Sequence, residues 1–253
     1  PLIRTLPQPA GNGPAATFVR RAKKLLDVAD QPEGMRFSIW NRILAQEEKL
    51  SIYSQDFLQA AAAASPFNYH RQYFADTEFT DPISRAQYVD LKAYLVDCLL
   101  LKSDKVTSAF SLECRVPLLD SRLVELVASL PAEYKYRHGR TKHVLREAMR
   151  DVLPRSIVDR GKQGFILPLG RWFNTDLLGF AREVLLDSRT LQRGYFESSG
   201  LRRFLNGMTL VDDRYARRLY ALLMFEMWNR VFVDRLEAPQ EPTVPAHLGE
   251  IRT

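Results

Sequence analysis

The chain has 253 residues, of which 46% are hydrophobic and 26% charged, so it has the composition of a folded globular protein and not of a disordered or fibrous one. Thirty-six basic and 30 acidic residues give a net charge of +6, which favours anionic partners without choosing among nucleotides, nucleic acid and acidic lipids. No stretch of about 18 apolar residues and no signal peptide can be read from the sequence, so a cytoplasmic location without membrane contact is expected. The two cysteines, Cys98 and Cys114, lie in apolar segments and are expected to be buried thiols.

Helices account for most of the predicted structure, because apolar residues recur at a spacing of three and four while β-branched alternation is almost absent. Residues 1–16 are predicted to be a linker, residues 17–236 the helical part, and residues 237–253 a flexible tail. An amphipathic basic helix is expected from Thr17, with about eight to ten helices in all and no internal repeat. The other predicted helices span residues 38–50, 56–64, 83–101, 123–130, 141–153, 177–186, 199–208 and 215–236.

The helix over 83–101 has the clearest start signal, since Asp81 can cap it and Pro82 suits its first turn. Its apolar residues lie on adjoining faces, which predicts a long and mostly buried helix. The predicted fold class is therefore mainly α-helical.

Charged residues are unusually dense between Tyr94 and Asp120. Burying an unpaired charge in a protein interior costs roughly several kcal/mol. Some of these charged residues are therefore expected to face a cleft. The alternative is that these charged residues form salt bridges on the surface, where the chain leaves the helix. In the segment Leu112–Asp120, Glu113 and Arg115 are expected to share one side of an extended strip.

A second segment, Asp159–Phe165, places Lys162 and Gln163 between two glycines. Glycines let the backbone approach a ligand, and a lysine on such a loop can meet phosphate oxygens. The alternative is a glycine-rich surface turn. Neither a Walker loop nor a G-x-G-x-x-G motif is present in the sequence.

Four segments, in this order and spacing, resemble the carboxy-terminal synthetase domain of the glutamine-dependent asparagine synthetases. They are Tyr94–Lys105, Ser111–Asp120, Arg140–Arg146 and Arg160–Phe165. The resemblance implies that the chain is the helical carboxy-terminal part of an α/β synthetase domain of the ATP-pyrophosphatase type, which is similar to the adenine nucleotide alpha hydrolases.

The same resemblance implies a ligase that uses ATP and Mg²⁺ to activate the side-chain carboxylate of aspartate as an acyl-adenylate, releases pyrophosphate and forms an amide with ammonia from glutamine. By position, Lys162 is implied to be the catalytic lysine at the phosphate and Glu113 the group that accepts a proton. Positions implied to bind substrate or nucleotide are Arg115, Asp120, Asp97, Asp104, Lys105 and Gly164. No metal ligand is assigned within the chain.

Three family features are missing from the sequence: an amino-terminal cysteine with its glutaminase domain, the Ser-Gly-Gly-x-Asp-Ser pyrophosphate loop, and a later Gly-Gly-Asp-Glu acidic segment. Ser198-Ser-Gly200 is only a poor remnant of that loop. We therefore expect a fragment or a separately encoded half that is inactive without the missing part and exposes an apolar face; a homodimer is left open.

Three alternatives remain at the level of sequence. The chain could be a non-catalytic partner or scaffold half of a split amide ligase, or a lactam-forming or otherwise amidating relative. A basic nucleic-acid-binding protein is disfavoured, because basic residues are spread over most helices and interspersed with acidic ones.

Overall fold

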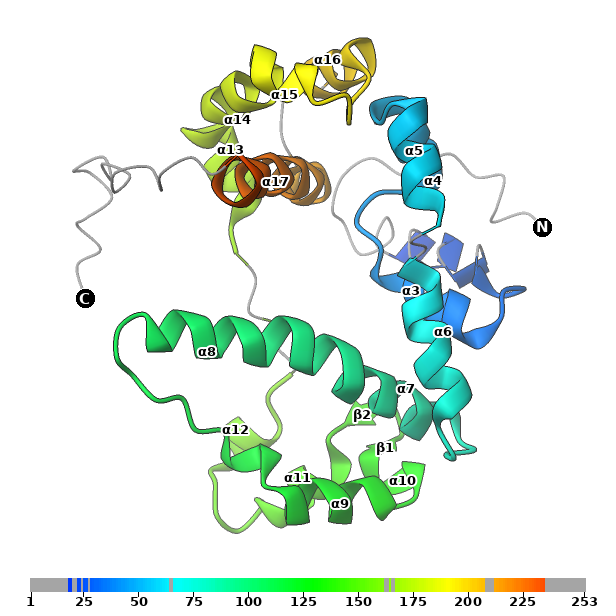
Figure 1. Cartoon of the computed structure of the whole chain (residues 1–253). Helices are drawn as coiled ribbons and strands as arrows, with labels where there is room; N and C mark the ends of the chain where they lie inside the picture. The colour runs from blue at the N-terminus through cyan, green and yellow to red at the C-terminus, as the bar shows by residue number, and fades with distance from the viewer. Residues whose placement is uncertain are drawn as a thin grey trace. The chain divides into compact units, whose positions relative to one another are not determined.

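The computed structural model describes residues 18–19, 22–23, 25–26, 28–63, 66–161, 164, 167–207 and 212–234. The predicted linker (1–16) and tail (237–253) lie outside the described residues. The described chain is mainly helical, as predicted (Figure 1), and within it no helix is long and apolar enough to cross a membrane. The chain divides into two compact units: unit 1 holds the residues up to Asn41 and Ser65–Gly164, and unit 2 holds Arg42–Ala64 and the residues from Phe165 onward.

Unit 1 is built from helices and one small β-hairpin. In chain order its elements are α3 (Glu33–Asn41), α6 (Pro66–Asp76), α7 (Pro82–Asp90), η1 (Leu91–Leu100), α8 (Leu101–Ser108), η2 (Pro117–Leu119), α9 (Ser121–Ser129), α10 (Ala132–Lys135), β1 (Tyr136–Arg137), β2 (Arg140–Thr141), α11 (His143–Ala148) and α12 (Arg155–Val158).

The helix predicted over 83–101 is longer in the structure, because α7, the π-helical η1 and α8 follow one another without a break (Figure 1). Its predicted start is confirmed, since the Asp81 carboxylate accepts a hydrogen bond of 2.8 Å from the backbone N–H of Ser84. The prediction of a mostly buried helix is wrong: Val89 and Ala93 are buried, but Tyr94 is 55% exposed. The apolar residues are spread too far around the helix for the neighbouring helices of this unit to cover them all.

The two cysteines are also exposed, which corrects the expectation of buried thiols. Cys98 lies on the uncovered part of η1, and Cys114 lies in the extended segment between α8 and η2. Apolar sequence neighbours do not bury a thiol when no other element packs over them.

Lys135, at the end of α10, is a buried charge that ties α10 to α7. Its ammonium donates hydrogen bonds to the Ser84 hydroxyl at 2.8 Å and to the Ala128 carbonyl at 3.0 Å. Burial lowers the pKa of Lys135, because desolvation disfavours the charged form.

The β-hairpin precedes α11. Its strands pair Tyr136 with Thr141 and Arg137 with Arg140, and the loop residues His138 and Gly139 both have positive φ, as a two-residue type I′ turn requires. Because Thr141 belongs to β2, the helix predicted from 141 begins at His143 and ends at Ala148, earlier than the predicted end at 153.

Unit 2 is built from helices in its described residues, with one isolated antiparallel bridge between Tyr53 and Phe196. Its elements are α4 (Gln46–Ile52), α5 (Gln55–Ala62), α13 (Leu169–Asn174), α14 (Leu177–Leu186), α15 (Ser188–Gln192), α16 (Ser198–Asn206), α17 (Asp213–Trp228) and the π-helical η3 (Asn229–Val233).

Two predictions about helix number and extent are wrong. The single helix predicted over 38–50 is two helices, α3 and α4, because the backbone at Ala45 is extended and its N–H is capped by the Glu48 carboxylate at 2.7 Å. The described residues contain fifteen α-helices and not eight to ten, since several have only four to six residues and carry no periodic pattern. Helix α14, by contrast, has the predicted bounds.

The core of unit 2 forms around α17, whose Leu219 and Leu222 are fully buried together with Phe173 of α13. Gly200 lets α16 approach α4 closely: a Cβ at this position would lie 1.8 Å from the Ser51 carbonyl oxygen. The Ser198-Ser-Gly200 sequence is therefore a helix start and a packing contact.

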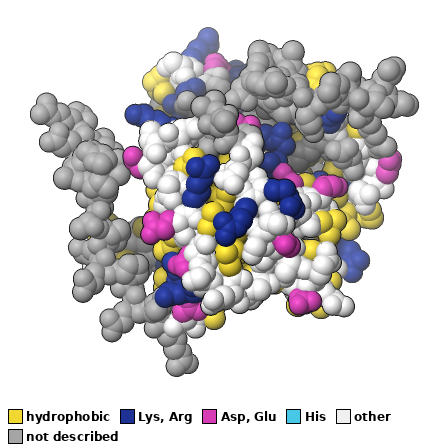
Figure 2. Space-filling view, turned by 90° about the horizontal axis from the view of Figure 1, so that it is seen from above, with side chains coloured by type: hydrophobic (Ala, Val, Ile, Leu, Met, Phe, Trp, Pro, Cys, Tyr) yellow, Lys and Arg dark blue, Asp and Glu magenta, His cyan; other side chains and the backbone are white. Residues whose placement is uncertain are grey.

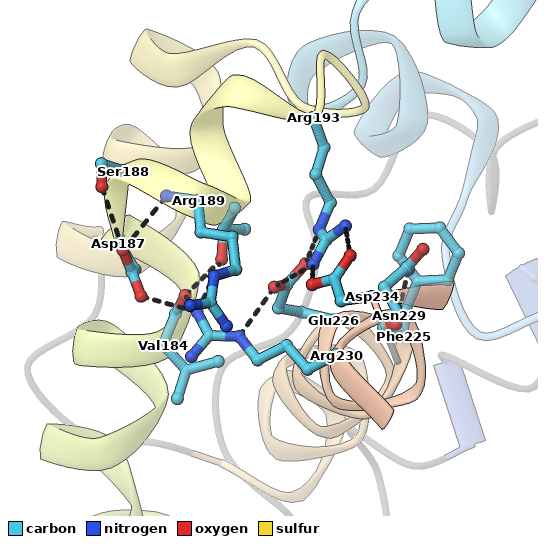
Figure 3. A network of polar contacts seen from close by, with 11 residues as sticks. Val184, Asp187, Ser188, Arg189, Arg193, Phe225, Glu226, Asn229, Arg230 and Asp234 are labelled. Atoms are coloured by element: carbon cyan, nitrogen blue, oxygen red, sulfur yellow. Dashed lines mark hydrogen bonds and ion pairs between the residues drawn. The ribbon is translucent and has the colours of Figure 1, made fainter. Parts of the chain in front are cut away.

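A network of ion pairs lies inside unit 2 beside the core (Figure 3). Glu226 of α17 has no exposed side-chain surface and accepts hydrogen bonds from Arg193 and Arg230. Arg193 also pairs with Asp234, and Arg230 pairs with Asp187 at 2.9 Å. The two arginines therefore connect α15, α17 and the end of α14.

Candidate functional site

The charged strip between α8 and η2 lies on the surface of unit 1. Glu113 and Arg115 form an ion pair of 2.9 Å with 72% and 80% of their side chains exposed. The prediction that these two residues share one side of an extended segment is confirmed. The charged residues of this region are all exposed, as in the alternative of ion pairs on the surface at the end of the helix; they are Asp97, Lys102, Asp104, Lys105, Glu113, Arg115 and Asp120. The expectation that some of them face a cleft stays a prediction.

Asp120, at the end of this strip, stabilises the start of α9. It is the N-cap of α9, accepting hydrogen bonds from the backbone N–H groups of Arg122 at 3.1 Å and Leu123 at 3.4 Å. The Arg122 guanidinium, together with these N–H groups, lowers the pKa of the Asp120 carboxyl. Asp120 is therefore ionised at neutral pH and holds η2 against α9.

Asp97 accepts a hydrogen bond from the Tyr69 hydroxyl, which joins η1 to α6. This hydrogen bond raises the pKa of Tyr69. Asp104 and Lys105 lie on the exposed surface of α8, which ends at Ser108, before the strip begins at Leu112. The structure thus places the three residues of the first motif along one long helix.

Lys162 and Gln163 lie outside the described residues. The flanking glycines, Gly161 and Gly164, are exposed, and a Cβ added at Gly161 would meet nothing within 4 Å. Gly161 follows α12 directly after Asp159 and Arg160.

Unit 1 contains a cavity of about 380 Å³, a volume within the range of small-molecule sites. It brings together three of the segments singled out in the sequence: Leu118 from the strip, the Arg140–Arg146 segment, and the Arg160–Gly161 segment. The lining contains three basic side chains and no acidic one. The lining residues are Leu118, Thr141, Lys142, Leu145, Arg146, Met149, Leu153, Ile157, Val158, Arg160 and Gly161.

Lys142 enters this cavity from a strained backbone position. Its φ of 60° and ψ of 37° are left-handed, a conformation that costs a residue with a Cβ about 1–2 kcal/mol. Such outliers gather at functional sites, where the surrounding structure maintains them. Lys142 lies in the Arg140–Arg146 segment of the family resemblance, but the sequence pattern assigns it no role, since a left-handed residue after a hairpin has no periodic pattern.

Arg146 of α11 also lines this cavity. Its side chain contacts both the hairpin and the segment that follows α12. Its guanidinium donates to the carbonyls of Thr141 at 3.2 Å, of Val158, and of Arg160 at 3.1 Å. Nearby, Arg140 pairs with Asp159 at 2.7 Å and lowers the pKa of that carboxyl. The hairpin and the segment before Gly161 are therefore linked by two arginines.

No group of three or more His, Cys, Asp or Glu side chains in the described part of the chain is placed to hold a metal ion.

The lining of this cavity combines apolar side chains with the basic Lys142, Arg146 and Arg160. The sequence matches the asparagine synthase family over residues 7–230, so the chain belongs to that family. No solved structure matches the chain.

Similar curated proteins are asparagine synthetases. The chain is 29% identical over 171 residues to "Asparagine synthetase [glutamine-hydrolyzing] 1" of Bacillus subtilis (strain 168), which covers 68% of this chain and 27% of that protein. It is 43% identical over 75 residues to the asparagine synthetase [glutamine-hydrolyzing] of Mesocricetus auratus, covering 28% of this chain and 13% of that protein. The chain therefore spans about a quarter of the first relative's length.

Proposed function

We propose that the chain supplies the carboxy-terminal, helical part of an ATP-pyrophosphatase-type synthetase domain that makes amides from carboxylates. The observation that carries the proposal is the meeting of three family segments around one cavity with three basic and no acidic side chains. Such a lining favours a group with several negative charges, and polyphosphate has that charge.

The proposed reaction has two steps. A side-chain carboxylate oxygen of aspartate attacks the α-phosphorus of ATP, and the bond to pyrophosphate breaks to leave an acyl-adenylate. Ammonia, derived from glutamine, then attacks the acyl carbon, the bond to AMP breaks, and the nitrogen loses a proton. Magnesium would enter with the phosphates of ATP, as metal–nucleotide complexes commonly do.

The residues of this chain have distinct tasks in the proposal. Lys162 offsets the negative charge that develops at the α-phosphate, and Lys142 and Arg160 attract the phosphates to the cavity. Glu113 accepts the proton from the attacking nitrogen. Arg115, Asp97, Asp104, Lys105 and Gly164 are proposed to border the substrates, as the family resemblance implies.

Asp120 is better explained as the cap of α9 than as a ligand, because its carboxylate is already engaged by Arg122 and two backbone N–H groups. We keep it in the proposal as the residue that fixes the end of the strip. Leu118, two residues earlier, lines the cavity.

The alternatives differ in what they require. As a non-catalytic half of a split ligase, the chain would need a second protein for any turnover; as a lactam-forming relative, it would use a carboxylate and an amine of one substrate. On the face seen in Figure 2, acidic and basic side chains are interspersed, whereas a nucleic-acid-binding protein would gather basic side chains in a patch.

The proposal is tested by assaying the complete product of the gene and residues 1–253 in parallel. With ATP, Mg²⁺, aspartate and ammonia, we expect the complete product to release pyrophosphate and asparagine in equal amounts, and residues 1–253 alone to release none. Activity that appears only on adding a second protein would support the partner-half alternative. No pyrophosphate release with aspartate or any other carboxylate would overturn the proposal.

A further inference from the structure

Three carbonyl oxygens from two separate segments converge on the guanidinium of Arg146. The Thr141 carbonyl belongs to the last residue of β2, whereas the Val158 and Arg160 carbonyls belong to the end of α12 and the residue that precedes Gly161. A planar guanidinium with five N–H donors can hold several acceptors in fixed directions, which a lysine cannot do.

The backbone of the second segment has no comparable link of its own. Its backbone hydrogen bonds at Ile157, Val158, Asp159 and Arg160 all run to residues three or four positions earlier, within α12 and its ends. Val158 is buried, but a single apolar side chain does not fix the direction of the chain that follows it. The polar contacts that hold this segment to the hairpin are those of Arg146 and of the pair Arg140–Asp159.

These two contacts differ in strength for a physical reason. Arg140 and Asp159 are 55% and 58% exposed, and an exposed ion pair contributes little because water and salt screen it. Arg146 is half-buried: its hydrogen bond to the Val158 carbonyl is partly buried, whereas those to the Thr141 and Arg160 carbonyls are exposed. All three are made by a charged donor, which strengthens a hydrogen bond. Arg146 therefore determines where Arg160 and Gly161 lie relative to Thr141 and Lys142.

We propose that Arg146 is the positioning residue of this site: its guanidinium clamps the segment Val158–Arg160 to the exit of the hairpin, and thereby keeps Lys142 and Arg160 on one cavity. This inference adds a positioning residue to the proposed function, and the kinetic part of its test rests on that function. Arg146 itself need not touch substrate, because its donors are used on the backbone carbonyls.

The test uses the complete protein with Arg146→Ala and the conservative Arg146→Lys, which keeps the charge but cannot reach three carbonyls. The matched control is Arg140→Gln, which removes the exposed ion pair between the same two segments. Hydrogen exchange of the amides at 159–161, urea unfolding, and kcat and KM for aspartate-dependent pyrophosphate release are measured for each variant.

For both Arg146 variants we expect amide exchange at 159–161 to rise at least tenfold and kcat to fall at least tenfold, with KM for aspartate changed less than twofold. The urea midpoint of Arg146→Lys and all values for Arg140→Gln should stay close to wild type. Unchanged exchange at 159–161, or wild-type kcat in Arg146→Lys, would overturn the inference and leave the proposed function standing. If the wild-type protein released no pyrophosphate, the proposed function would fail, and the exchange data would still decide whether Arg146 is the clamp.

Discussion

The Arg193 side chain donates a hydrogen bond of 2.9 Å to Glu226, a carboxylate with no exposed surface inside unit 2. A second arginine, Arg230, donates to the other carboxylate oxygen at 2.8 Å (Figure 3). Removing one member of a buried ion pair leaves an uncompensated charge in a region of low dielectric, which is strongly destabilising.

We therefore expect Glu226→Gln to lower the free energy of unfolding by about 3 kcal/mol. Urea unfolding followed by circular dichroism measures this change. The control is Glu183→Gln on the exposed surface of α14, which should stay within about 0.5 kcal/mol of wild type. Equal effects of the two substitutions would show that the buried network contributes nothing specific.

The same network predicts a loss of stability in acid. The Arg193 guanidinium lowers the pKa of Asp234, and backbone N–H and arginine contacts lower the pKa of Asp187. Since both pKa values are lower in the folded state, the unfolded chain binds more protons in this range, and stability is lost as pH falls below the unfolded value of about 3.9.

Asp234→Asn should therefore reduce the slope of unfolding free energy against pH below about pH 4 and lower stability at pH 7. Urea titrations at several pH values between neutral and acid provide the comparison. Asp176→Asn, at an exposed position without a side-chain cap bond, serves as control and should keep the wild-type slope. A wild-type slope in Asp234→Asn would contradict the prediction.

Two glycines in helices of unit 2 should respond oppositely to the same substitution. Gly200→Ala would bring a Cβ against the Ser51 carbonyl oxygen, so we expect a loss of about 2 kcal/mol or more from the forced separation of α4 and α16. Gly179→Ala in α14 meets open space and should gain about 0.5–1 kcal/mol from helix propensity. Thermal unfolding distinguishes these outcomes, and the same sign for both would refute the packing argument.

Lys142→Gly should separate stability from activity. Glycine relieves the left-handed backbone strain, so the melting temperature should rise, whereas loss of the ammonium at the cavity should reduce pyrophosphate release about tenfold or more. His138→Gly is the matched control, because His138 also has positive φ in the same hairpin but does not line this cavity. It should stabilise the protein without changing turnover. Wild-type turnover in Lys142→Gly would remove Lys142 from the proposal.

Lys162→Ala in the complete protein tests the lysine that the sequence singles out. We expect pyrophosphate release to fall about 100-fold with little change in melting temperature, because the lost contact is a charge-assisted one at the transition state. Lys162→Arg should restore only part of the rate, since its donors have another geometry. A large fall in melting temperature with Lys162→Ala would instead indicate a structural role.

Local signals were sufficient to predict several features of this chain. The Asp81-Pro82 start, the bounds of α14 and the placement of Glu113 and Arg115 on one side of an extended segment each depend on residues within a few positions of one another. Caps, helical periodicity and alternation across an extended segment are all local in this sense.

The remaining features depend on residues that are distant in sequence. The Arg146 guanidinium, which lines the cavity, reaches carbonyls 12 and 14 positions away, and no spacing rule indicates such contacts. The exposure of Cys98 and Tyr94 likewise depends on whether another element packs over an apolar helix face, which the sequence of that helix does not encode.

The path of the chain through the two units has a consequence for its synthesis. The chain passes from unit 1 to unit 2 after Asn41, returns at Ser65 and leaves again after Gly164. Contacts such as that of Ser54 with Gly194 join residues 140 positions apart. At ordinary ribosomal rates, roughly 7 to 30 seconds pass between the synthesis of α4 and α5 and the synthesis of the helices that pack against them. Because both units are discontinuous in sequence, no single cut in the chain yields either of them whole.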